Sequence, residues 1–545
     1  MTVLRETGLR ETGLQQTGLQ QTGLRQVKLR QTGLRQTGLL QILAGFRWPG
    51  VSKLLAAVLL TGSQWGLAGS RVAEAQIQPY CNFSAEDITQ KQTFLVGALQ
   101  GDRNAGNRYR NLIEQHGDRL RRCRRESWLK NQAVWLRLYP CDARPGAIEY
   151  LMDQIVNRGY NQVYVEVFGG GQVLLPRAEN NTPWPSVVRT PGFENRDLLA
   201  EAIAKGRERG LKVYAWMFSM NFGHTYAQRP GAEQILARNG RGQNSMTFNG
   251  ATGINSLGEV VSEEVFIDPY NPQAKLEFYN LAQAIARRRP DGMLFDYIRY
   301  PKGNGNASVA GRVQDLWVYS PASQQALLQR ALNPSGQDLI RRFLQRGYVT
   351  AQDIQDIATA YPLDGQPLWQ GRSPDPLYAS LTPDQARPSL QTELWQLSVA
   401  HAFQGVLDFL TAGTTPAQQA GIPAGVVFFP EGNQTVGAGG YDSRLQFWDR
   451  FPSNLEWHPM SYATCGRADC IVRQVQRVLA GAPAGARVIP VLAGTWGRSV
   501  SNRPPLETQM QAIRQSAPQI NAISHFALSW QDPEGDRTRK SCRLP

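Results

Sequence analysis

The stretch of residues 134–168, VWLRLYPCDARPGAIEYLMDQIVNRGYNQVYVEVF, contains one complete β–α–β unit. Its two ends, 134–139 and 163–168, are rich in the β-branched and aromatic residues that strands favour. Between them, apolar residues recur at the spacing of one buried helix face, at Ile148, Leu151, Met152, Ile155 and Val156. Gly159 suits the end of that helix. Two strands joined by a helix predict parallel pairing in one sheet.

The same alternation continues along the chain. Helices are predicted at 197–209 and from Asn271-Pro272, where Asn suits the N-cap and Pro the first helical position. The other predicted strands are 211–218, 292–298, 426–429, 455–458, 487–492 and 524–530. Eight strands alternating with helices favour a closed (β/α)8 TIM barrel of the α/β class over an open doubly wound sheet.

The predicted organisation has three parts. Residues 1–75 form a leader, residues 76–130 form a helical N-terminal extension, and residues 131–545 form the TIM barrel. A long insertion, 302–390, follows the fourth strand and carries helical patterns of its own. We expect it to form a small subdomain over the active face, and residues 393–410 to supply the fourth barrel helix.

The leader combines a repeat with an export signal. Residues 4–38 repeat a five-residue, glycine-containing unit that is typical of low-complexity sequence. Basic Arg47 and Lys53, an apolar run over 54–67 and Ala73-Glu-Ala75 then follow in the order of a secretory signal. The apolar run is short and interrupted, so we expect cleavage near Ala75 and an exported protein, with an uncleaved anchor as the alternative to a removed signal.

Charge and cysteines bear on the environment of the protein. The net charge is +14, and residues 1–75 hold nine Lys/Arg and three Asp/Glu, which leaves +8 for the remainder. This suits an anionic polymer such as a cell wall, or simply a solvated basic surface; scattered arginines without a known motif argue against nucleic acid. All six cysteines follow residue 75, which predicts disulfides. Cys465 and Cys470 are expected to pair, and the other four can pair in three ways.

Asp296 is the first candidate for a catalytic group. It lies late in an apolar predicted strand, between Phe295 and Tyr297, and active sites of such barrels lie at the C-terminal ends of the strands. An ionised carboxylate among apolar neighbours is costly unless it is paired or used. The alternative to a catalytic role is an internal ion pair, for instance with Arg299 or Arg137.

A carboxyl group that hydrolyses a bond by acid–base chemistry normally works with a second one. Glu166 lies inside the second predicted strand, and Glu431 directly follows the fifth. Each is a candidate partner, and each is equally consistent with an ion pair or an ordinary loop position. Glu456 begins the sixth strand at the opposite end of the barrel, which predicts a structural role. No spacing typical of a zinc site is present, and we predict neither a metal nor a cofactor.

Further residues near strand ends are candidates for binding a substrate. Aromatic rings pack on apolar C–H faces, such as those of sugars, while polar groups bind hydroxyls. The tryptophans could instead pack in the core, and Asp268 could instead cap a turn. The candidates are Arg137, Trp216, Asn221, His224, Asp268, Arg299, Tyr300, Tyr462, Trp496 and Trp530.

The segment Asp291-Gly-Met-Leu-Phe-Asp-Tyr-Ile-Arg-Tyr-Pro301 resembles the strand-four motif of the glycosyl-hydrolase-like family 10. Supporting stretches occur in the family's order at 133–136, 161–167, 210–216, 266–269 and 459–462. The resemblance implies a barrel, a bacterial envelope setting and action on a glycan such as peptidoglycan strands. It implies a catalytic role for Asp296. Where relatives often have Gln this chain has Glu166, strand five often lacks an equivalent of Glu431, and Pro459-Met replaces Pro-Gln.

The sequence therefore predicts a glycoside hydrolase of the cell envelope that acts on a polysaccharide. A carbohydrate-binding barrel without hydrolytic activity is the main alternative. A structural envelope protein that uses the insertion 302–390 to contact a partner is the third.

Overall fold

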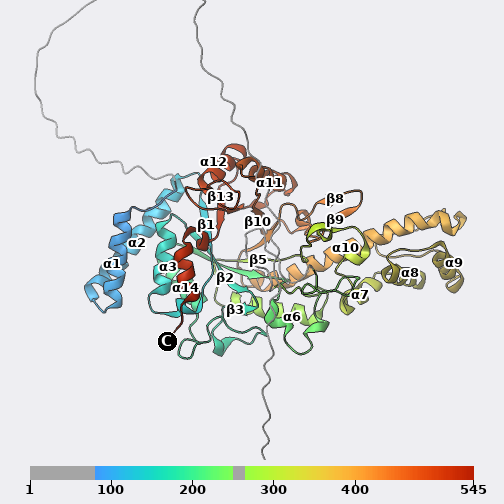
Figure 1. Cartoon of the computed structure of the whole chain (residues 1–545), viewed down its shortest axis with the longest axis horizontal. Helices are drawn as coiled ribbons and strands as arrows, with labels where there is room; N and C mark the ends of the chain where they lie inside the picture. The colour runs from blue at the N-terminus through green and yellow to red at the C-terminus, as the bar shows by residue number, and fades with distance from the viewer. Residues whose placement is uncertain (1–79, 249–263, 545) are drawn as a thin grey trace, which may run out of the picture. The chain divides into compact units, whose positions relative to one another are not determined.

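The computed structural model describes residues 80–248 and 264–544. The predicted repeat and export signal within residues 1–75 lie outside the described residues. Two helices precede the barrel, α1 (Ala85–Leu99) and α2 (Arg103–Glu126). Ser84 and Asp102 cap their N-termini, because each side chain accepts hydrogen bonds from backbone N–H groups of the first turn. Figure 1 shows both helices outside α3 (Ala147–Asn157).

Eight parallel strands of the described chain close into a barrel, which confirms the predicted fold class. Closure is made by β1, whose Val134 lies in register with Val163 on one side and His525 on the other. The strands are β1 (Asn131–Leu136), β2 (Gln162–Gly169), β4 (Lys212–Phe218), β5 (Gly292–Asp296), β7 (Ala424–Phe428), β10 (Glu456–Ser461), β12 (Val491–Ala493) and β13 (Ala522–Phe526).

Most predicted strands differ from the structure by a few residues at their ends, and two differ more. The run predicted over 487–492 is divided into β11 (Arg487–Val488) and β12, and Pro490, which has no N–H to donate to a ladder, lies between them. The last strand ends at Phe526, and Trp530 lies in the short helix α13 (Leu528–Gln531). Trp530 therefore does not end strand eight, as the alternation had predicted.

The barrel helices pack outside these strands. They include α3, α4 (Leu198–Glu208), α6 (Pro272–Ala286), α10 (Pro383–Gln419), α11 (Ala468–Gly481) and α12 (Leu506–Ser516). Short elements β3 (Gln172–Val173) and α5 (His224–Ala227) lie in the loops after β2 and β4. The C-terminal helix α14 (Pro533–Ser541) packs on the turn Pro140–Ala143 that follows β1.

A long segment of chain separates β5 from α10, which begins at Pro383, inside the range 302–390 predicted for the insertion. The segment holds β6 (Val309–Ala310), α7 (Pro321–Leu328), α8 (Pro334–Arg346) and α9 (Ala351–Ala360). Strand β6 pairs with β9 (Gly440–Asp442), which also pairs with β8 (Thr435–Val436), so the insertion contacts the loop after β7. Helix α10 packs against α6 and α9, and Figure 1 shows it extending from the barrel toward α8 and α9.

Three disulfides join parts of the described chain, which fits a secreted protein. Cys465 bonds to Cys470, as predicted. Cys81 bonds to Cys123 in α2, and Cys141 bonds to Cys542 beyond α14. No helix within 80–248 or 264–544 is both long enough and apolar enough to cross a membrane.

Candidate active site

A cavity opens at the C-terminal ends of the barrel strands, where the fold places catalytic groups. It encloses about 560 Å³, including open solvent at its mouth. Aromatic rings make up much of its wall, from Trp135, Trp216, Phe218, Tyr297, Phe429, Tyr462 and Phe526. Its charged residues are Arg137, Glu264, Asp296 and Arg299. Apolar walls with a few charged groups are typical of a small-molecule or sugar site.

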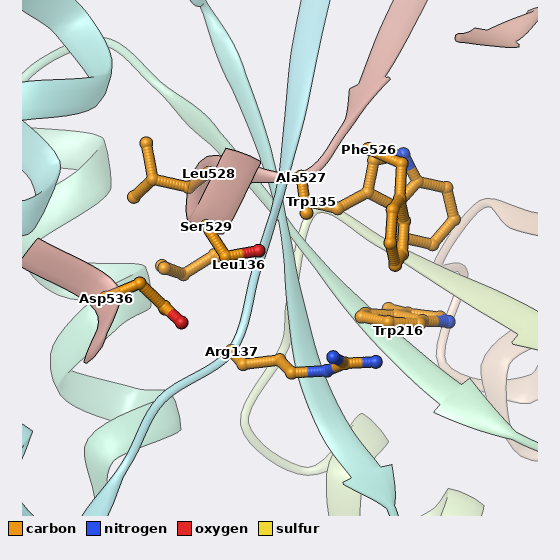
Figure 2. A pocket seen from close by; sticks show the side chains of 9 residues that line it. All are labelled: Trp135, Leu136, Arg137, Trp216, Phe526, Ala527, Leu528, Ser529 and Asp536. Atoms are coloured by element: carbon orange, nitrogen blue, oxygen red, sulfur yellow. The ribbon is translucent and has the colours of Figure 1, made fainter. Parts of the chain in front are cut away.

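A narrower pocket adjoins this cavity and shares part of its wall. Both are lined by Trp135, Arg137, Trp216 and Phe526, and the narrower one also by Ser529 and Asp536. Figure 2 shows Arg137 extending from the end of β1 toward the ring of Trp216. The guanidinium carbon lies 5.6 Å from the Trp216 ring centre and 5.9 Å from that of Phe526, within cation–π range.

Asp296 is the last residue of β5 and lies inside the cavity wall. Its side chain accepts hydrogen bonds from the indole N–H of Trp216 at 3.1 Å and from the backbone N–H of Tyr297 at 2.6 Å. Burial raises the pKa of Asp296 to about 6, although these bonds and the nearby Arg299 oppose the rise. A carboxyl group with this pKa can carry a proton at mildly acidic pH and donate it.

Tyr297 follows Asp296 with a backbone φ of 52°, in the left-handed region. This conformation ends the strand and its alternation, so that two consecutive side chains, Asp296 and Tyr297, both line the cavity. Tyr297 also packs against Phe218, with ring centres 4.3 Å apart.

Glu166, the first predicted partner, lies close enough to Asp296 to contribute to the rise of its pKa. Its carboxylate accepts a hydrogen bond of 2.9 Å from Nε of Arg137. Glu166 is not among the residues that line the cavity. A side chain on Gly169 would come within 2.7 Å of the Glu166 carboxyl carbon, so the absence of one there makes room for this ion pair.

The other two glutamates of the sequence prediction lie elsewhere. Glu431 follows β7 and accepts a hydrogen bond of 2.5 Å from the side chain of Gln474, away from the cavity lining. Glu456 lies at the start of β10, pairs with Arg487 and contacts the hydroxyl of Tyr214 at 3.5 Å. Arg487 and Tyr214 also belong to the N-terminal end of the barrel, as expected for a structural group.

Glu264 is a cavity carboxylate that sequence reasoning missed. It lies in the long loop after β4, two residues before Phe266, which bridges to Asn221. The position of Glu264 in the chain could have identified it as a candidate, because its loop leaves the C-terminal end of a barrel strand. Burial raises the pKa of Glu264, against the effects of Arg299 and of a hydrogen bond with the hydroxyl of Tyr297.

Four of the predicted sugar-binding residues line the cavity: Arg137, Trp216, Arg299 and Tyr462. Arg299 is buried, donates to the backbone carbonyl of Tyr300 at 2.9 Å, and lies 4.6 Å from the ring centre of Tyr297. Tyr462 faces Phe526 across the wall, with ring centres 6.1 Å apart.

The structure does not bring the remaining candidates into the cavity lining. Asn221 accepts backbone N–H bonds from Gly223 and Val265, and Asp268 accepts them from Tyr270 and Ser323, so both hold loops together. Tyr300 is fully buried and donates to the carbonyl of Ala402 in α10. His224 is exposed at the start of α5.

Trp496 and Trp530 line a different cleft, together with Arg158 and Arg498. Trp496 packs on Tyr80, with ring centres 4.9 Å apart, and donates to the hydroxyl of Tyr160 at 3.3 Å. Both rings are half-buried.

Within the described residues, one group of three side chains has the types and spacing of metal ligands, namely Cys465, Asp469 and Cys470. The two sulfur atoms of that group are bonded to each other, so they are not available as thiolate ligands.

Comparison with known proteins agrees with the family resemblance. Residues 125–326 match the model of the family glycosyl hydrolase-like 10. This range covers β1 through β5, with Asp296, Glu166 and Glu264. A search of curated proteins found no match.

Several solved structures share features with this chain at low similarity. A hypothetical protein from Ruminiclostridium thermocellum is 15% identical, with 31% of this chain and 77% of that chain covered and a TM-score of 0.23. A family 20 exo-β-N-acetylglucosaminidase from Vibrio harveyi is 11% identical, with 75% and 52% covered and a TM-score of 0.35. A β-N-acetylhexosaminidase from Bacteroides fragilis is 11% identical, with 74% and 62% covered and a TM-score of 0.34. This chain therefore spans about half the length of the Vibrio enzyme.

Proposed function

We propose that this protein is a glycoside hydrolase of the bacterial cell envelope that cleaves a polysaccharide, with peptidoglycan glycan strands as its substrate. The observation that carries this proposal is Asp296, a buried carboxyl group at the end of β5 that faces an aromatic cavity. Its pKa, raised to about 6 by burial, suits a group that protonates a glycosidic oxygen.

The surroundings of Asp296 support a sugar as the ligand. Trp216, Phe218 and Tyr462 contribute apolar ring atoms to the wall of the same cavity. Arg137 and Arg299 add hydrogen-bond donors that suit hydroxyl or carboxylate groups of a glycan. The three disulfides and the positive net charge are consistent with work at an anionic, extracytoplasmic polymer.

The test is hydrolysis of purified glycan strands by the wild-type protein and by Asp296→Asn. We expect the wild type to release reducing ends and the variant to be slower by about 10²–10⁴-fold, the usual contribution of an acid–base group. Asp118→Asn is the matched control, because Asp118 is exposed on α2, and it should behave as wild type. Release of reducing ends by Asp296→Asn at the wild-type rate would refute the proposal.

A carbohydrate-binding barrel without turnover is the second candidate. One observation favours it: Glu166 is bonded to Arg137 and Glu431 to Gln474, and neither lines the cavity. Glycan binding by the wild type without release of reducing ends, and equal binding by Asp296→Asn, would support this candidate over hydrolysis.

A further inference from the structure

We propose that Glu264 is the second carboxyl group of this active site and acts with Asp296 on the same glycosidic bond. This inference rests on the proposed hydrolase function. It gives Glu166 a different task, which is to hold Arg137 in place.

The first support is location. Glu264 and Asp296 line one cavity: Glu264 lies in the loop after β4, and Asp296 is the last residue of the neighbouring strand β5. The backbone beside Glu264 is fixed, since the N–H of Val265 donates to Asn221 at 2.9 Å and its carbonyl accepts from the N–H of Phe222 at 2.8 Å. Asn221 is thus a positioning residue for the loop that carries Glu264.

The second support is chemical environment. The carboxylate of Glu264 lies 3.9 Å from the guanidinium of Arg299, and the hydroxyl of Tyr297 lowers the pKa of Glu264. Arg299 lowers the pKa of both Glu264 and Asp296, so both carboxyl groups lie within electrostatic reach of one cation. The side chain of Glu264 is 22% exposed, which leaves it accessible to water and to a bound sugar.

The contrast with Glu166 completes the argument. The carboxylate of Glu166 is bonded to Nε of Arg137 at 2.9 Å, and Arg137 rather than Glu166 lines the cavity. Arg137 also lies over the rings of Trp216 and Phe526. Glu166 therefore affects a bound sugar through the position of Arg137.

The reaction consumes one water molecule. The carboxyl proton of Asp296 passes to the glycosidic oxygen as its bond to the anomeric carbon breaks. The oxygen of water bonds to that carbon, and a proton of that water passes to the carboxylate of Glu264. Proton exchange with solvent then restores Asp296 to its protonated form and Glu264 to its ionised form.

The first experiment measures release of reducing ends from purified glycan strands by Glu264→Gln. We expect a loss of about 10²–10⁴-fold, as for Asp296→Asn. The matched control is Glu233→Gln, because Glu233 lies in the same loop region, is 62% exposed and pairs with Arg238 at the surface. The control should retain wild-type activity, and activity of Glu264→Gln within about threefold of wild type would overturn the inference.

The second experiment distinguishes a reacting group from a structural one. Glu264→Ala leaves space in the cavity, so added sodium azide should enter, attack the anomeric carbon and form a glycosyl azide that mass spectrometry detects. Glu166→Ala should not be rescued, and Glu166→Gln should raise KM more than it lowers kcat. Azide rescue of Glu166→Ala in place of Glu264→Ala would assign the reacting role to Glu166.

Tyr297→Phe gives a readout that leaves both carboxyl groups in place. It removes the hydroxyl that lowers the pKa of Glu264, so the acidic limb of the kcat/KM profile should move to higher pH. An unmoved acidic limb would count against Glu264 as the group that must be ionised.

Failure of the inference and failure of the proposed function are distinguishable. If the wild type cleaves strands and Asp296→Asn does not, while Glu264→Gln remains active, only the inference fails. If the wild type cleaves no strands, the proposed function fails and the inference fails with it.

Discussion

Burial of the Asp296 carboxyl group has a consequence for stability as well as for chemistry. Its pKa is about 6 in the folded protein against 3.8 for a free aspartate, so the folded state binds the proton more tightly than the unfolded state. The free energy of unfolding contributed by this group is therefore highest at low pH and falls as the pH rises from about 4 through 6.

In Asp296→Asn the free energy of unfolding should no longer fall over this pH range. At pH 7.5 we expect the variant to be more stable than the wild type by at most about 3 kcal/mol, the free energy that corresponds to raising the pKa of Asp296 from 3.8 to about 6. The difference should nearly vanish at pH 4. Thermal unfolding of both proteins across this range measures it, with Asp118→Asn as the control for loss of a surface carboxylate. A difference in stability between the two proteins that does not depend on pH would contradict the raised pKa of the buried Asp296 carboxyl group.

Trp216 tunes the same carboxyl group through its indole N–H. In the wild type the hydrogen bond from Trp216 lowers the pKa of Asp296. Trp216→Phe keeps an aromatic ring but removes this hydrogen-bond donor. The pKa should rise, so the alkaline limb of the kcat/KM profile should move to higher pH. Phe218→Leu is a suitable comparison, because Phe218 lines the same cavity without donating a hydrogen bond. An alkaline limb that stays in place in Trp216→Phe would separate Trp216 from the protonation of Asp296.

At this scale the sequence predicted some placements and missed others. Asp296 ends an apolar strand, and both its burial and its position at the mouth follow from local pattern. Glu264 could not be ranked, because no periodicity governs a long loop and its neighbours Tyr297 and Arg299 come from the segment that follows β5. Tyr300 was a candidate because it follows a strand end, but its hydroxyl donates to the carbonyl of Ala402 in α10, a contact between segments far apart in the sequence.

At the scale of elements, all eight strands were predictable, because each carries a short apolar run between helical patterns. The ends of the strands were harder to predict from the sequence. The break between β11 and β12 depends on Pro490, and the early end of β13 at Phe526 depends on how the chain turns into α13. The contact of β6 with β9, between two segments far apart in the sequence, has no local signal.

A disulfide and the hydrogen bonds of Arg539 hold helix α14 against the segment that follows β1. Cys542 is bonded to Cys141, and Arg539 pairs with Asp142 at 2.7 Å and donates to the carbonyl of Arg137, also at 2.7 Å. The helix therefore supports the backbone of a cavity arginine from behind.

The double variant Cys141→Ser/Cys542→Ser should loosen this helix. We expect faster amide hydrogen exchange over 533–541 and a raised KM, since the support of Arg137 weakens, while exchange in the barrel strands changes little. Cys465→Ser/Cys470→Ser is the control, because that disulfide closes a short loop after β10. Unchanged protection of α14 in the first variant would show that the ion pair alone holds it.

For the molecule as a whole, the disulfides predict the redox state and its effect on stability. The protein should show no reactive thiols when denatured without reductant and six after reduction. The bond between Cys81 and Cys123 spans 42 residues, which corresponds to about 4 kcal/mol in the chain-entropy model. Reductant should therefore lower the unfolding temperature, and free thiols in the unreduced protein would contradict the pairing.

The pairing of β1 with both β2 and β13 also sets an order of events during synthesis. Strand β1 gains one neighbour early, but its second neighbour is residues 522–526, nearly 400 residues later in the chain. Until those residues are made, the sheet has two open edges that can pair with other chains. The contacts that close the barrel are thus among the most distant in sequence, which favours slow folding of a finished chain over folding on the ribosome.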